Sequence, residues 1–184
     1  MSSPAYAGKE LAAAFRTVRK NTIQVAEDIP ESKYDFVAAP EVRSVAKMLT
    51  HVAIAPRIWE EFNQEKLTTL VGFNFAGFLE QFSIEENKPR SKAEILELLR
   101  SGGEGFAGWL ETRTPEFLAE TVTEPDGKTI KTRFERLLGA KEHEMHHRAQ
   151  LMLIERQLGI VPHLTRQFQE RMAQMREQQS AAKA

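Results

Sequence analysis

Apolar residues recur every three or four positions along most of the chain, which predicts an all-helical protein. The pattern indicates long helices over residues 8–28, 42–64, 92–112 and 133–158. It also predicts a last, largely polar helix with a narrow apolar stripe over about residues 164–179. Amphipathic helices of this kind bury their apolar faces against one another, so the pattern favours a helical bundle.

Local signals mark where two of these helices begin and where one is interrupted. Ser91 with Glu94, and Thr132 with Glu135, each form the S/T-x-x-E pattern of a capping box at a helix N-terminus. Pro56 falls inside the stretch 42–64, where it removes one backbone hydrogen bond. We therefore expect a kink in that helix.

The helix over residues 133–158 is apolar on two faces. The first face carries His143, His147, Leu151, Ile154 and Leu158. The roughly opposite face carries Phe134, Leu138, Met145, Ala149 and Met152. A helix with two apolar faces is expected to be buried on both sides. One face should meet the bundle core, and the other needs either the last helix or a second subunit.

Two connecting segments are long enough to form structure of their own. Residues 65–90 are rich in phenylalanine and could contain a short helix over 74–82. We expect its phenylalanines to plug one end of the core, where they could also form a pocket wall. Residues 121–132 include an Asp-Gly turn signal and predict a small hairpin, too small to found a sheet.

Composition narrows the class of protein. The 184 residues include 41% hydrophobic and 28% charged residues, as in a globular domain, and we expect one domain over residues 1–184. A net charge of −1 gives no general attraction to nucleic acid or to an anionic membrane. No stretch approaches the roughly 20 apolar residues of a membrane span, and the N-terminus lacks a signal-peptide pattern. We expect a cytoplasmic location.

The histidines are the candidate metal ligands. Three of the five lie within residues 143–147. Residues four apart on a helix differ by roughly 40° in direction, so His143 and His147 can converge on one ion, whereas His146 is a poorer partner. Two imidazoles make a weak metal site, so a third ligand is needed. His51 lies beside the apolar stripe of the helix over 42–64 and is either that ligand or a structural histidine.

A second interpretation of the same residues is a zinc hydrolase. His143, Glu144 and His147 fit the H-E-x-x-H pattern, in which the glutamate acts as a general base. The extended form of that motif needs glycine at 150 and histidine at 153, where this chain has Gln150 and Leu153. No segment has the pattern of an edge strand that could align a substrate, as expected in this class of hydrolase. We therefore place this alternative below a site built between helices of a bundle.

The pattern around the histidines resembles the DinB/YfiT-like metalloprotein superfamily. The matching residues are Ser44-Val-Ala-Lys-Met-Leu-Thr-His51, Trp59, His143-x-x-x-His147-Arg-Ala-Gln150-Leu151 and Leu158-Gly159-Ile160-Val-Pro162. The resemblance covers a core of about residues 8–162 and implies an up-down-down-up four-helix bundle, frequently a homodimer. It also implies a divalent-metal site made by His51, His143 and His147. The Phe-rich connector and the C-terminal helix lie outside the common pattern.

The resemblance also suggests a function. The metal is expected to be zinc or nickel, with iron as another candidate. Characterised relatives include transferases and isomerases that use a low-molecular-weight thiol, so a thiol and a small electrophile are the expected substrates. The chain has no cysteine, and the thiol nucleophile would arrive with the cosubstrate. Gln150, rather than Arg148, is expected beside His147, where it would hold either this metal-binding histidine or the substrate. The alternative is a non-catalytic, stress-associated metal-binding dimer.

Overall fold

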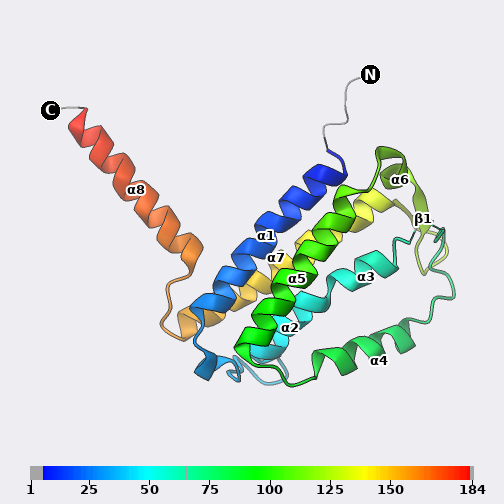
Figure 1. The fold of residues 1–184 in the computed structure, drawn as a ribbon, viewed down its shortest axis with the longest axis horizontal. Coiled ribbons are helices and arrows are strands. Elements are labelled where there is room, and N and C mark those ends of the chain that lie inside the picture. Colours follow the sequence, from blue (N-terminus) through cyan, green and yellow to red (C-terminus); the bar gives the residue numbers. More distant parts are fainter. Residues whose placement is uncertain (1–5, 65, 183–184) are drawn as a thin grey trace.

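Four long helical segments form the body of the molecule (Figure 1). The computed structural model describes residues 6–64 and 66–182. The segments are α1 (Gly8–Asp28), α2 (Val45–Ile54) with α3 (Pro56–Glu61), α5 (Lys92–Glu111) and α7 (Arg133–Gln157). Helices α1 and α7 run in one direction, and α2–α3 and α5 run in the other. The predicted up-down-down-up four-helix bundle is confirmed.

The predicted caps fix the starts of the helices. Both capping boxes are present: the hydroxyls of Ser91 and Thr132 accept from the amides of Glu94 and Glu135, whose carboxylates reach back. A cap of this kind contributes about 1 kcal/mol. At the other end of α7, Gly159 adopts the left-handed conformation, with φ 77°, that favours glycine after a helix.

The second segment differs from its prediction in both bounds and continuity. The expected helix over 42–64 begins at Val45, capped by Ser44, and ends at Ile54. Pro56 then starts the short helix α3, so the expected kink is a break between two helices. Proline has no backbone N–H to continue a helical ladder, but it fits the first position of a new one.

Close packing of α1 and α2 against α5 depends on two glycines. A Cβ atom on Gly103 would lie 2.7 Å from Cγ of Arg19, whose side chain crosses the bundle at this level. A Cβ atom on Gly102 would lie 3.2 Å from the carbonyl oxygen of Ala53 on α2. The glycine pair therefore makes room for neighbouring helices in the middle of α5.

The Phe-rich connector forms a helix that lies beside α2 and α3 (Figure 1). This helix, α4 (Phe75–Glu86), is longer than the predicted 74–82, and none of its residues is buried. Phe62 at the end of α3 packs against Phe73, Phe75 and Phe78, with ring centroids 5.0–5.4 Å apart. The phenylalanines form a half-buried cluster around Phe62, so the expectation of a buried plug is wrong.

The remaining short elements lie in the connectors. A 3-10 turn, η1 (Glu31–Lys33), follows α1, and α6 (Pro115–Ala119) follows α5. Strands β1 (Thr121–Thr123) and β2 (Ile130–Thr132) pair antiparallel at the end of the bundle where α7 begins. The predicted small hairpin is therefore present.

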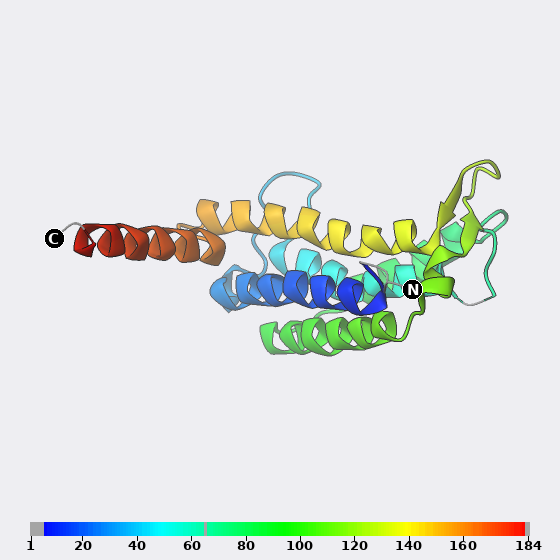
Figure 2. The ribbon, with the colours of Figure 1, turned by 90° about the horizontal axis from the view of Figure 1, so that it is seen from above.

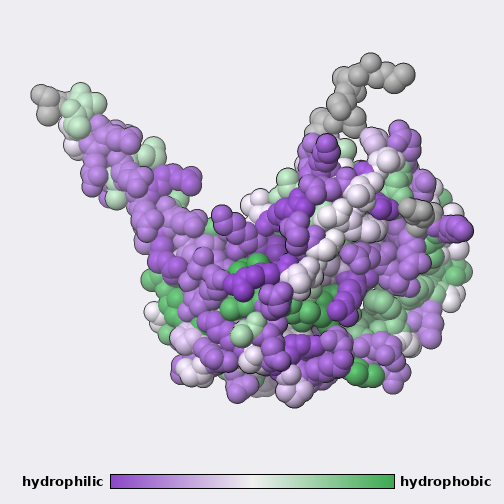
Figure 3. All heavy atoms as spheres, viewed as in Figure 1, coloured by the Kyte–Doolittle hydropathy of each residue, from purple (hydrophilic) through white to green (hydrophobic). Residues whose placement is uncertain are grey.

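The last helix, α8 (His163–Ala181), projects away from the bundle (Figures 1 and 2). Its surface is mostly hydrophilic, with a few apolar residues that include the exposed Phe168 and Met175 (Figure 3). Because α8 does not cover α7, Met145 and Ala149 on the second face of α7 are exposed. The expectation that α7 is buried on both sides is therefore wrong over this part of the helix. Among the described residues, no helix has the length and apolar character to cross a membrane.

Candidate metal centre

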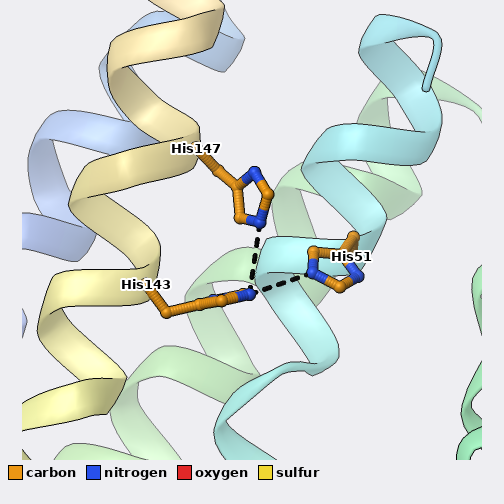
Figure 4. A group of neighbouring side chains, drawn as sticks. All are labelled: His51, His143 and His147. Atoms are coloured by element: carbon orange, nitrogen blue, oxygen red, sulfur yellow. Dashed lines mark hydrogen bonds between the residues drawn. The ribbon is translucent and has the colours of Figure 1, made fainter. Parts of the chain in front are cut away.

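Three histidines from two helices meet inside the bundle (Figure 4). His51 comes from α2, and His143 and His147 lie one turn apart on α7. Nε2 of His143 lies 3.0 Å from Nε2 of His51 and 3.2 Å from Nε2 of His147. One possible ligand atom from each residue lies within 4.8 Å of the other two. The structure thus brings together the three residues expected from the sequence.

The close approach of three ring nitrogens fits a shared cation. A neutral imidazole nitrogen is either a donor or an acceptor. One proton on Nε2 of His143 can therefore satisfy only one of its two short contacts. A metal ion between the rings would use a lone pair from each of them. Three neutral imidazoles form a donor set found in catalytic metal sites, where further coordination positions stay open.

The surroundings keep these imidazoles in the form that binds metals. Burial lowers the pKa of His143 to about 3, and the neighbouring His147 and His51 add to this effect. Burial also lowers the pKa of His51, against the opposing hydrogen bond to Glu86. The pKa of His147 is lowered for the same reason. All three rings are therefore neutral at pH 7, with lone pairs available to an ion.

The Nδ1 atoms of two of the rings form hydrogen bonds with side-chain oxygens outside the cluster. Nδ1 of His51 lies 2.8 Å from Oε2 of Glu86, and Nδ1 of His147 lies 2.8 Å from Oε1 of Gln150. Nδ1 donates in both contacts, which leaves the Nε2 lone pairs facing the centre. Gln150 therefore lies beside His147 as expected. Nδ1 of His143 is buried and has no hydrogen-bond partner among the described residues.

Sequence reasoning missed Glu86 and its partner Arg43. The Arg43 guanidinium donates to Glu86 at 2.6 Å, so this carboxylate bridges Arg43 and His51. Burial alone would raise the pKa of Glu86, but the hydrogen bonds from Arg43 and His51 outweigh it and lower the pKa. Glu86 lies at the end of the Phe-rich segment, whose position relative to His51 no sequence pattern indicates.

Aromatic rings flank the histidines. The Trp59 ring centroid lies 5.2 Å from that of His143, and the Phe82 centroid lies 5.5 Å from that of His51. Trp59 comes from α3 and Phe82 from α4, so both helices contribute to the surroundings of the site. These rings give the histidine cluster an apolar border.

Glu144, the base required by a zinc hydrolase of the H-E-x-x-H type, belongs to a different part of the structure. Its side chain is buried in an ion pair with Arg19 at 2.9 Å. Arg19 also donates to the carbonyl oxygens of Leu99 and Val52. His146 is exposed and lies near Gln150, outside the three-histidine group. The structure therefore gives no support to the hydrolase interpretation of this motif.

Comparisons with solved structures agree with the fold. The DinB-like protein YjoA from Bacillus subtilis aligns with a TM-score of 0.61 and 21% identity, over 82% of this chain and 92% of that one. YfiT from Bacillus subtilis, described as "a probable metal-dependent hydrolase with an unusual four-helix bundle topology", aligns with a TM-score of 0.66 and 17% identity, over 87% and 94%. At these identities the likeness concerns the fold alone.

A third solved structure has the same fold. The mycothiol-dependent maleylpyruvate isomerase aligns with a TM-score of 0.61 and 12% identity, over 82% of this chain and 63% of that one. A comparison with curated proteins gives no match. The family model of the DinB family matches residues 1–180, nearly the whole chain. The chain therefore belongs to the DinB family.

Proposed function

We propose that His51, His143 and His147 bind a divalent metal ion, zinc or nickel in preference to iron. The observation that carries this proposal is the convergence of three neutral imidazole nitrogens within 4.8 Å. Imidazole suits all three metals, so the preference among them rests on the family resemblance. The description of YfiT as metal-dependent adds support.

The proposed activity is the transfer of a low-molecular-weight thiol to a small electrophile. When bound, the metal ion would act as a Lewis acid that stabilises a thiolate. In the reaction, the thiol S–H bond breaks and its proton passes to solvent, while the sulfur forms a bond to an electrophilic carbon. The leaving group of that carbon, chloride in the case of an alkyl chloride, departs with the electrons of its bond. The chain has no cysteine, so this sulfur must come from a cosubstrate. The mycothiol dependence of a protein with the same fold supports this choice.

Residues around the histidines have two different proposed roles. Trp59 and Phe82 present apolar ring surfaces beside His143 and His51. Such surfaces favour the apolar part of an electrophile. Gln150 holds His147 through its side-chain oxygen. We propose that Gln150 orients this ligand.

The second candidate function is that of a stress-associated, non-catalytic metal-binding dimer. It is favoured by exposed apolar side chains along one side of α7 and on α8. They are Met145 (42% exposed), Leu153 (59%), Phe168 (62%) and Met175 (46%). We propose that these residues form a homodimer interface, which is compatible with either function.

A ligand screen separates the two functions. The zinc-loaded protein is mixed with glutathione, mycothiol or bacillithiol, each with and without an electrophile such as monochlorobimane, and thioether formation is followed by fluorescence. The transferase proposal predicts turnover with at least one thiol and none in His51→Ala. Absence of turnover with every thiol, in protein that retains its metal, would favour the binding function.

A further inference from the structure

We propose that Glu86 is a positioning residue for the metal site, and that it couples metal binding to the docking of helix α4. This inference rests on the proposed metal site at His51, His143 and His147. It concerns the helix formed by the Phe-rich connector. It assigns that helix a role in setting the metal affinity.

The Glu86 carboxylate bridges His51 and Arg43. One oxygen lies 2.8 Å from Nδ1 of His51, and the other lies 2.6 Å from Nε of Arg43. The Glu86 and His51 side chains are only 11% and 12% exposed, so the contact is shielded from water. A carboxylate that accepts from one imidazole nitrogen fixes the tautomer and makes the other nitrogen a stronger metal ligand.

Glu86 lies in the last turn of α4. Helix C-termini favour cations because the unpaired carbonyls there carry partial negative charge. The last turn of α4 instead carries Glu85 and Glu86 and has no basic residue. The cation that meets Glu86 is Arg43, from the connector before α2. Glu85 is paired with Lys88 and Arg90 just beyond the helix. Only the charge of Glu86 is balanced elsewhere, by Arg43 and by its contact with His51 at the proposed metal site.

Helix α4 has few buried contacts with the bundle. None of its residues is buried. Its first half packs through aromatic rings on Phe62, and its second half meets the bundle through Phe82 and Glu86, both on His51. The same imidazole therefore serves the metal and holds the end of α4. An element with so little buried surface opens at low free-energy cost.

These contacts link two equilibria. A metal ion that fixes the His51 ring also fixes the donor that Glu86 needs, so metal binding stabilises docked α4. By thermodynamic reciprocity, docked α4 must increase metal affinity by the same factor. Removal of the Glu86 charge therefore weakens both metal binding and the docking of α4.

The test compares Glu86→Gln with Glu80→Gln, the same change at an exposed position of α4. Zinc affinity is measured by competition with a chromogenic chelator, with His51→Ala alongside. We expect the Kd for zinc to rise about ten- to hundredfold in Glu86→Gln, the range typical of such partners, and less than twofold in Glu80→Gln. An unchanged Kd in Glu86→Gln, with binding lost in His51→Ala, would overturn the positioning role and leave the metal proposal intact.

The coupling has its own readout in backbone amide exchange over residues 75–86. Zinc is expected to slow exchange there in the wild type and in Glu80→Gln, and to have a much smaller effect in Glu86→Gln. Exchange that is insensitive to zinc in zinc-binding wild-type protein would overturn the coupling. The wild-type part of this measurement needs no variant. It therefore tests whether metal binding and α4 docking are coupled even if Glu86→Gln fails to fold. If His51→Ala binds zinc as the wild type does, the proposed metal site itself fails.

Discussion

Arg19 and Glu144 form a buried ion pair at 2.9 Å between α1 and α7, and Glu144 does not belong to the group of His51, His143 and His147. Their side chains are 4% and 2% exposed. The Arg19 guanidinium also donates to carbonyls of α2 and α5, so it connects all four segments of the bundle. The glutamate of the apparent H-E-x-x-H motif is therefore a structural residue.

Glu144→Ala is predicted to destabilise the protein by about 3–5 kcal/mol, because it leaves Arg19 buried and without its counter-charge. Bound metal per folded chain should not change. Urea unfolding and metal analysis check the two parts, with Glu142→Ala as an exposed control on the same helix. Loss of metal without loss of stability would contradict the structural role of Glu144.

Gly103→Ala is predicted to lower stability by about 1–3 kcal/mol, because its Cβ atom would overlap Arg19 in a packed interface. Alanine is the better helix former by about 1 kcal/mol, so the effect opposes intrinsic propensity. Gly105→Ala is the matched control, since a Cβ atom there meets nothing within 4 Å. It should stabilise the helix slightly. Equal melting temperatures for the two variants would show that Arg19 does not occupy this space.

Glu155 gives a prediction for pH dependence. Its side chain is fully buried, and neither carboxylate oxygen has a hydrogen-bond partner among the described residues. Burial and then the nearby Asp28 raise its pKa to about 7, against Arg166 and Arg156. The folded protein therefore binds more protons than the unfolded chain between about pH 4.5 and 7, and this residue costs stability as the pH rises through that window.

Glu155→Gln removes this dependence. The variant should be more stable than wild type by about 1–3 kcal/mol at pH 8, with the difference shrinking toward pH 4.5. Urea unfolding across this range measures it, with Glu142→Gln as the exposed control. A variant that is less stable than wild type at pH 8 would mean that the Glu155 carboxylate has a stabilising partner.

The proposed homodimer predicts a solution mass of twice 20.9 kDa by light scattering. The double variant Met145→Glu, Leu153→Glu places two charges on the exposed face of α7 and should shift the protein to monomer. Val37→Glu replaces another exposed apolar residue, 48% exposed and outside this face, and should leave the mass unchanged. A monomeric wild type at micromolar concentration would refute the interface.

Much of the fold follows from local signals. The capping boxes at Ser91 and Thr132 mark the starts of α5 and α7 to within a residue, because side-chain and backbone partners lie three positions apart. The hairpin follows from its turn residues. The break at Pro56 follows from the chemistry of proline, although α2 and α3 are shorter than the apolar pattern suggests.

The surroundings of the site were less predictable. Helical spacing brings His143 and His147 together, and the family resemblance adds His51. Glu86 could not be found in this way, because its contact with His51 depends on how α4 packs across a long connector. Periodicity likewise identifies Met145 as apolar but not what covers it, and α8 leaves that face exposed.

The metal content of histidine variants tests the central claim most directly. Wild type, His51→Ala, His143→Ala, His147→Ala and the neighbouring control His146→Ala are loaded with zinc, desalted and measured by elemental analysis. We predict about one zinc per chain in the wild type and in His146→Ala, and far less in the other three. Retention of zinc in His51→Ala, or its loss in His146→Ala, would contradict a site formed by His51, His143 and His147.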